Sequence, residues 1–267
     1  MAAAELDERQ FVRYARHLIL DEVGEEGQAK LLAARVLVVG AGGLGSPVAL
    51  YLAAAGIGTL GLVDFDTVDA SNLQRQIVHA DAAVGRRKVD SAADTLARLD
   101  PALRVETHHA KVTADNVDAL VGAYDLVVDG SDNFATRYLV HDACHFARRT
   151  LVSGALLRFE GQLSTFKSHD GVSSCYRCLF PAPPPADLIP RCEEAGILGS
   201  VAGVIGTLQA TETLKEILGL GTSLAGTLLI YDALDTQFRR IKVPKDPGCA
   251  LCGTHPTIRP KGPHFVA

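Results

Sequence analysis

Residues 35–45, RVLVVGAGGLG, join a short apolar run to a cluster of glycines. The run Arg35–Val39 is aliphatic and largely β-branched, which is typical of a parallel strand buried on both faces. The glycines that follow have the spacing G-x-G-x-x-G. They permit a tight turn, and a helix N-terminus beyond it would present free amides to phosphate. The stretch therefore predicts a strand, a phosphate-binding turn and a helix in succession.

Strand and helix patterns alternate from this point to residue 150. Apolar runs predict strands at 59–63, 103–107 and 124–128, and helical patterns cover 46–55, 88–99 and 134–148. Such alternation is typical of an α/β protein with helices on both faces of a parallel sheet. We therefore predict a Rossmann-like, doubly wound, mostly parallel sheet in residues 35–150, preceded by N-terminal helices in residues 1–34.

The pattern changes after residue 150. Two strand pairs, 151–157 with 162–167 and 227–231 with 237–243, follow each other without a crossover helix, which predicts an antiparallel extension of the sheet. Between the pairs, the proline-rich residues 181–185 predict an extended loop. An apolar helix is expected at 194–218, broken or kinked among Gly199, Gly203 and Gly206. Residues 151–253 thus form an extension with a crossover loop, all within one domain, and 254–267 form a tail.

Composition excludes several classes of protein. The 267 residues are 48% apolar, which supports an ordered core, and the net charge is −5. No block of Lys or Arg suits a general nucleic-acid or anionic-membrane binder, and no apolar run is long enough to span a bilayer. Because the acidic residues 1–10 lack an apolar leader segment, we expect a cytoplasmic protein.

A nucleotide site is expected at the carboxyl edge of the sheet. Gly40, Gly42, Gly43 and Gly45 form the turn. Asp64 ends the second strand about twenty residues later, where its carboxylate can accept hydrogen bonds from ribose hydroxyls. This combination alone does not distinguish NAD, FAD and ATP.

The next groups favour a triphosphate. Asn72, Arg75 and Lys88 follow the second strand, while Asp132 and Asn133 follow the fourth. Two cations suit a triphosphate, and a carboxylate facing it suits magnesium. Taken singly, Asp132 is equally explained as a helix N-cap, and the two cations as solvated charges.

Six cysteines in a cytoplasmic chain point to metal or thiol chemistry. The pairs Cys175-x-x-Cys178 and Cys249-x-x-Cys252 have the spacing of a four-thiolate structural zinc site, with two redox pairs as the alternative. Cys144 is expected to be a buried thiol. Cys192 follows Arg191 just before a predicted helix, which can lower a thiol's pKa, although two glutamates follow it.

The motifs together resemble the MoeB/ThiF/HesA family, bacterial relatives of ubiquitin-activating enzymes. They are Arg13-Tyr-Ala-Arg16, Gly40 to Gly45, Leu62-Val-Asp-Phe-Asp-Thr67, Ser71-Asn-Leu-Gln-Arg-Gln76, Val84-Gly-Arg-Arg-Lys88, Asp129-Gly-Ser-Asp-Asn133 and the two cysteine pairs. The resemblance implies ATP-dependent adenylation of the C-terminal glycine carboxylate of a ubiquitin-like sulfur carrier. That carrier would be MoaD-like, for molybdopterin, or ThiS-like, for thiamine.

The resemblance also implies residue roles. Gly43 and nearby amides would contact the phosphates, Asp64 the ribose, Lys88 the triphosphate and Asp132 the magnesium ion. The remaining triphosphate contacts fall on Ser71, Asn72, Leu73, Gln74 and Arg75. Family members are homodimers in which an arginine, here Arg16, reaches the partner's ATP. Cys192 stands where some members link covalently to the carrier, and His17 departs from the glutamine common in that motif.

Three rival functions remain open at this point. An NAD-dependent oxidoreductase would share the glycine turn and Asp64 but would not need Asn72, Arg75, Lys88 and Asp132. A non-catalytic scaffold would lack ATP-site residues, and a relative that adenylates a tRNA base fits poorly with the acidic charge. About fifteen residues follow Cys252, too few for a rhodanese domain, so a separate sulfur donor is expected.

Overall fold

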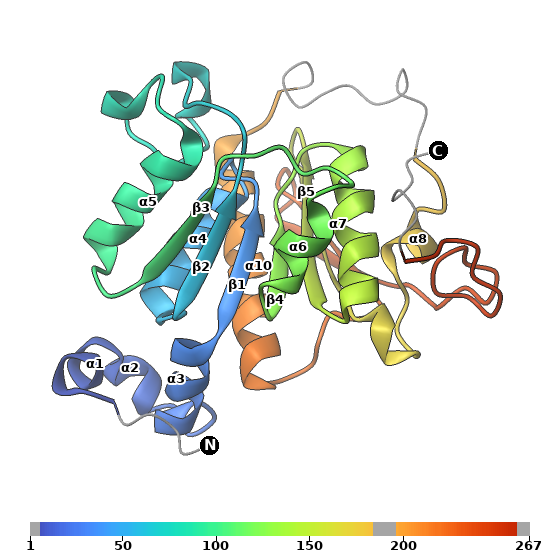
Figure 1. The fold of residues 1–267 in the computed structure, drawn as a ribbon, viewed down its shortest axis with the longest axis horizontal. Coiled ribbons are helices and arrows are strands. Elements are labelled where there is room, and N and C mark those ends of the chain that lie inside the picture. Colours follow the sequence, from blue (N-terminus) through green and yellow to red (C-terminus); the bar gives the residue numbers. More distant parts are fainter. Residues whose placement is uncertain (1–5, 184–195, 261–267) are drawn as a thin grey trace.

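A computed structural model describes residues 6–183 and 196–260 of the chain (Figure 1). One eight-stranded sheet runs through it in the order β3-β2-β1-β4-β5-β6-β7-β8. Strands β3 to β5 pair in parallel and β5 to β8 antiparallel, which confirms the predicted α/β sheet with its extension. The strands are β1 (Arg35–Val39), β2 (Thr59–Val63), β3 (Arg104–His108), β4 (Leu126–Asp129), β5 (Thr150–Leu157), β6 (Glu160–Phe166), β7 (Thr227–Asp232) and β8 (Gln237–Lys242).

Helices cover both faces of the parallel part. Apolar side chains of α4, α5 and α10 share one core cluster with β1, β2 and β4, and α6 and α7 share another with the opposite face. The sheet is therefore doubly wound, as predicted. The helices described are α1 (Glu8–Arg13), α2 (Ala15–Leu18), α3 (Gly24–Ala33), α4 (Gly45–Ala55), α5 (Lys88–Leu99), α6 (Val117–Gly122), α7 (Phe134–Ala147), α8 (Tyr176–Leu179) and α10 (Gly199–Leu218), with short 3-10 helices η1 (Ala70–Asn72), η2 (Asp81–Ala83) and η3 (Ser168–Asp170).

One prediction about the helices is wrong. Helix α10 begins at Gly199 and runs without a break through Gly203 and Gly206 to Leu218. A Cβ on Gly206 would lie 2.4 Å from Pro47 Cγ and 2.6 Å from the Leu44 carbonyl oxygen. Gly206 therefore lets α10 pack closely against the start of α4 rather than interrupting the helix.

The N-terminal helices lie beneath the sheet, at the end away from the glycine turn (Figure 1). They are anchored by Tyr14, whose hydroxyl donates to Asp100 and whose ring is buried. The short helix α6 between β3 and β4 was not predicted. The sheet is continuous across residue 150, because β4 and β5 pair directly.

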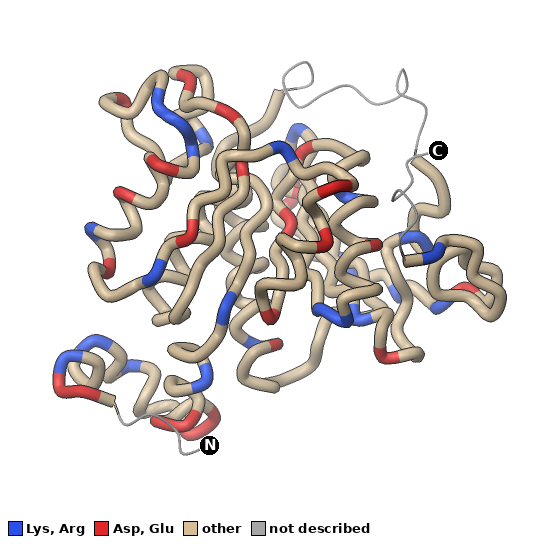
Figure 2. Tube along the Cα trace, viewed as in Figure 1, with Lys and Arg blue, Asp and Glu red and all other residues tan. Residues whose placement is uncertain are grey.

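Charge is distributed over the whole trace. Figure 2 shows acidic and basic residues interspersed along the coloured tube. The described residues include short basic runs such as Arg86-Arg87-Lys88. None of the helices in the described ranges combines the length and apolarity needed to cross a bilayer.

Candidate functional site

A cavity of about 730 Å³ opens at the carboxyl ends of β1, β2 and β4. Strand β1 pairs with both β2 and β4, so this edge is the topological switch point, where open α/β sheets bind ligands. The structure brings ten of the predicted nucleotide-site residues together along the wall: Gly40, Gly42, Gly43, Asp64, Ser71, Asn72, Arg75, Lys88, Asp132 and Asn133.

The glycine turn has the conformation that its sequence predicts. Gly40 has a φ of +90°, a region that favours glycine, and α4 begins five residues later. Gly45 does not line the cavity. A Cβ at Gly45 would lie 1.8 Å from the Gly40 carbonyl oxygen, so its role is to let the helix pack against the turn.

Asp64 holds this turn in place. Its carboxylate accepts the Ala41 N–H at 2.8 Å and the Asp66 N–H at 2.8 Å. Because a carboxylate has about four acceptor positions, it retains capacity for the predicted contact with a ribose hydroxyl.

The two predicted cations reach the cavity from different elements. Lys88 opens α5; its side chain is 7% exposed, and its Nζ lies 2.9 Å from an Asp66 carboxylate oxygen. Arg75 follows η1 and donates to the Ser71 carbonyl oxygen at 3.2 Å. Asp69 caps η1, and hydrogen bonds from Ser71 lower the pKa of that carboxyl. The cations are thus fixed by local structure and face one space.

Asp132 is exposed on the cavity wall, and it is not the helix cap. The cap of α7 is Asn133, whose side chain accepts the Thr136 N–H at 2.9 Å. The Asp132 carboxylate accepts only a long contact, 3.4 Å, from Asn133 Nδ2 among the hydrogen bonds described. Its oxygens are therefore available to a hard cation such as Mg²⁺.

Some wall residues were missed in the sequence. Lys111 follows β3, Arg137 lies in the first turn of α7, and Gln76 ends a quoted motif, yet all three line the cavity. Arg137 donates to the Ser131 carbonyl oxygen at 2.9 Å. Its position four residues after Asn133, the cap of α7, was the available signal, because residues at that spacing lie on the same side of a helix.

Other predicted residues lie elsewhere. Leu73 and Gln74 do not line the cavity. Arg16 is exposed on α2 and does not line it either. Cys192 lies outside the described residues.

A second cavity of about 290 Å³ adjoins the first over β5 and β6. Its lining is mostly apolar and includes Leu157, Phe166 and Leu228. The two cavities share Asp132, Arg137 and Leu156. The second, largely apolar cavity therefore borders the first, polar cavity that the cations line.

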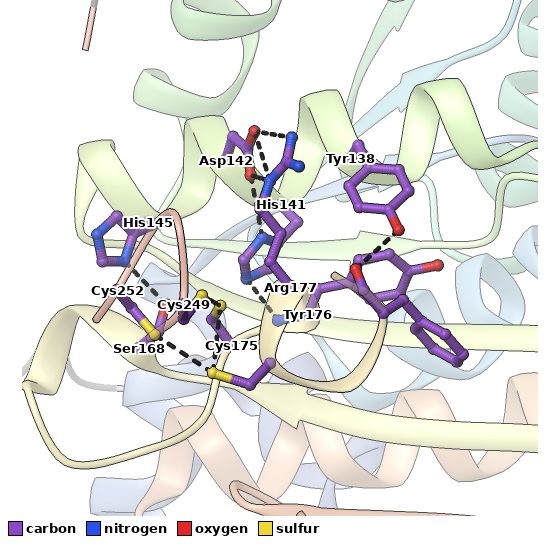
Figure 3. Close-up of polar contacts among 12 residues, drawn as sticks. Tyr138, His141, Asp142, His145, Ser168, Cys175, Tyr176, Arg177, Cys249 and Cys252 are labelled. Atoms are coloured by element: carbon purple, nitrogen blue, oxygen red, sulfur yellow. Dashed lines mark hydrogen bonds and ion pairs between the residues drawn. The ribbon is translucent and has the colours of Figure 1, made fainter. Parts of the chain in front are cut away.

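The four cysteines of the two pairs converge close to α7, where Phe146 packs against them (Figure 3). Their sulfurs lie within 4.8 Å of one another, with Sγ–Sγ distances of 3.4 Å for Cys175–Cys249 and for Cys178–Cys252. A tetrahedral zinc site with bonds of about 2.3 Å places its sulfurs about 3.8 Å apart, whereas a disulfide needs about 2.05 Å. The donor set and spacing therefore fit zinc.

A buried ion pair ties this cluster to α7 (Figure 3). Arg177, between the first two cysteines, donates to both Asp142 oxygens at 2.7–3.2 Å. Burial acts to raise the pKa of Asp142, but hydrogen bonds from His141 and Arg177 outweigh it and hold the pKa below its usual value. The Tyr176 N–H also donates to His141 Nε2 at 3.1 Å.

The fold and cavity are of the kind that binds nucleotides in α/β proteins: a glycine turn lies at the switch point, with cations gathered around it. The chain belongs to the ThiF family, whose model matches residues 14–251.

Named relatives are about 50% identical to the chain over the aligned residues. The adenylyltransferase and sulfurtransferase MOCS3 of Anopheles gambiae is 50% identical over 95% of this chain and 57% of its own length. The probable adenylyltransferase/sulfurtransferase MoeZ of Mycobacterium tuberculosis is 49% identical over 92% and 63%. The sulfur carrier protein adenylyltransferase of Thermus thermophilus is 48% identical over 92% of each. The chain thus spans little more than half of the first relative and nearly all of the last.

Solved structures share the fold. E. coli MccB with ATP has a TM-score of 0.76 at 21% identity, covering 90% of this chain and 73% of that one. MccB with MccA-N7isoASN has a TM-score of 0.80 at 20% identity, covering 91% and 75%.

Proposed function

We propose that this protein is an ATP-dependent adenylyltransferase that activates the C-terminal glycine carboxylate of a ubiquitin-like sulfur carrier. The carrier proposed is MoaD-like and serves molybdopterin synthesis. One observation carries the proposal: a cation-lined cavity above the glycine turn meets an apolar cavity at Asp132, Arg137 and Leu156. A triphosphate suits the first space, and a carrier's extended C-terminal segment suits the second. The names of the relatives support the same activity.

The reaction joins two anions. A carboxylate oxygen of the carrier attacks the α-phosphorus of ATP; the bond to the β-phosphate oxygen breaks and pyrophosphate leaves with its electron pair. The protein's main tasks are to align the reactants and to neutralise charge. We assign the glycine-turn amides, Arg75 and Lys88 to the phosphates, and Asp64 to the ribose.

Two metals complete the proposal. Asp132 would hold magnesium, which supplies positive charge against the triphosphate. The four cysteines would hold zinc with no open coordination position, which makes that site structural. The magnesium role rests on the exposed Asp132 oxygens, and the zinc role on the sulfur spacing.

The function is tested by its product. Incubation with ATP, magnesium and a MoaD-like carrier is expected to give a carrier heavier by one AMP, because the acyl-adenylate forms before sulfur transfer. Mass spectrometry of the intact carrier measures it. Adduct formation with a ThiS-like carrier alone would move the pathway to thiamine synthesis. If neither carrier is modified, or if NAD instead of ATP raises the melting temperature, the proposal fails.

We further propose a homodimer in which Arg16 serves the partner's site. Arg16 is exposed, and the same N-terminal segment exposes Val12 (81%) and Ile19 (70%), an apolar surface of the kind that interfaces cover.

Complementation tests this arrangement. Arg16→Ala and Asp132→Ala are each expected to be inactive, but their mixture should recover about one quarter of the unsubstituted activity after subunit exchange. After exchange, half of the dimers contain one subunit of each variant. In each of these dimers one of the two sites has both Asp132 and the partner subunit's Arg16 intact. Sedimentation checks the dimer. Absence of recovery in proven mixed dimers would place Arg16 in its own subunit's site or outside catalysis.

Further parts of the proposal concern sulfur chemistry. We propose that sulfur comes from a separate donor protein and that Cys192 forms a covalent link to the carrier. A Cys192→Ala protein would then adenylate the carrier without supporting sulfur transfer. The proposed reaction belongs in the cytoplasm and involves neither nucleic acid nor membrane.

A further inference from the structure

A histidine behind the glycine turn has no role in the reaction described so far. His79 lies between η1 and η2, is 8% exposed and does not line either of the two cavities. Its Nε2 lies 2.9 Å from the Ala41 carbonyl oxygen, and its Nδ1 lies 2.9 Å from Ser91 Oγ. Both ring nitrogens therefore have partners on separate elements.

The partners determine the tautomer. The Ala41 carbonyl can only accept, so Nε2 must carry the proton, and in the neutral ring Nδ1 then accepts the Ser91 hydroxyl. Burial lowers the pKa of His79, which favours this neutral form. Ser91 is 3% exposed and is fixed on α5.

Ala41 is the second residue of the glycine turn, and both its polar backbone groups are held. Its N–H donates to Asp64 at 2.8 Å, and its carbonyl accepts from His79. A turn rich in glycine has many accessible conformations. All but one of them must be excluded before the amides of the turn can converge on phosphate. Asp64 thus fixes the backbone N–H of Ala41 and His79 fixes its backbone carbonyl, so together they restrict the turn.

We propose that His79 is a positioning residue that fixes the phosphate-binding turn through the Ala41 carbonyl, with Ser91 selecting its tautomer. The inference rests on the proposed nucleotide site. Helix α5 thereby serves that site twice: Lys88 at its first residue faces the cavity, and Ser91, one turn later, fixes the histidine behind the turn.

Two substitutions separate positioning from packing. The amide nitrogen of Gln reaches the place of Nε2, so His79→Gln keeps the donor to Ala41. The shorter His79→Asn reaches only the place of Nδ1, so it loses that donor. Both remove the ring and should lower the melting temperature similarly.

The expected result is a difference in ATP affinity. By calorimetric titration with Mg-ATP, His79→Asn should raise Kd by about tenfold, the effect of one lost buried hydrogen bond, and His79→Gln by less than about threefold. His145→Asn is the matched control, because His145 also bonds a serine, Ser168, at 2.8 Å, away from this cavity. Its Kd should not change.

Ser91→Ala provides a milder variant should His79→Asn fail to fold. It should raise Kd by about threefold in the unsubstituted protein and have no effect in the H79Q background, where the serine has no ring to orient. Equal Kd values for His79→Asn and His79→Gln, or equal effects of Ser91→Ala in both backgrounds, would overturn the inference. Failure of the unsubstituted protein to bind Mg-ATP would instead refute the nucleotide site itself.

Discussion

Asp132→Ala is expected to lower carrier-dependent exchange of pyrophosphate into ATP by about 100-fold or more while leaving the melting temperature nearly unchanged. Charge stabilisation by a bound metal is worth several kcal/mol, and each 1.4 kcal/mol is tenfold in rate. Asp132 is exposed, and Asn133 caps α7, so removing the carboxylate takes away no helix cap or buried contact. The two readouts together separate a chemical role from a folding role.

A matched control is Asp235→Ala. Asp235 is also exposed, in the β7–β8 turn, and lines neither of the two cavities. Its exchange rate should equal that of the unsubstituted protein. Lys88→Ala should lower the exchange rate as Asp132→Ala does, because Lys88 lines the same space from α5. An Asp132→Ala protein that exchanges pyrophosphate normally would remove this residue from the proposed magnesium site.

Local patterns predicted the parts of the fold that depend on neighbouring residues. The helix at 88–99 and the strand at 59–63 have the predicted limits, because a strong apolar period or run defines each. The short α6 has only six residues and too little periodicity to be recognised. The continuity of α10 depends on α4, since only that contact explains the close packing at Gly206.

The site shows the same division. Residues directly after a strand, such as Asp64 and Asp132, could be placed at the sheet edge because parallel strands end there together. His79 could not, because its role depends on Ala41 and Ser91, which are 38 and 12 residues away. Arg137 was missed as well, although its position four residues after Asn133 was a signal for it.

The cysteine cluster was the most accurate long-range prediction. Four sulfurs meet from segments 74 residues apart in the chain. This contact could be predicted because the Cys-x-x-Cys spacing marks each pair as half of a metal site. The ion pair that holds α8 to α7 was not predictable, since nothing in the sequence connects Arg177 with Asp142.

Loss of zinc is expected to lower the melting temperature by about 10 °C or more. In a domain of this size about 1 kcal/mol corresponds to 2–4 °C, and a structural zinc site contributes more than this. The metal would join α8 to residues 249–252, and α8 is in turn held to α7 by the Arg177–Asp142 pair. Metal analysis should find one zinc per chain, and chelation should give the lowered melting temperature.

The matched variants are Cys178→Ser and Cys144→Ala. Cys144 is also buried, but it lies in the apolar cluster with α7 and away from the other sulfurs. Cys178→Ser should lose zinc and show the lower melting temperature, whereas Cys144→Ala should keep one zinc per chain. Stoichiometric zinc in Cys178→Ser, or none in the unsubstituted protein, would contradict the four-thiolate site. Because none of the four cysteines lines the nucleotide cavity, Mg-ATP should still bind zinc-free protein below its lowered melting temperature. This result would separate a structural metal from a catalytic one.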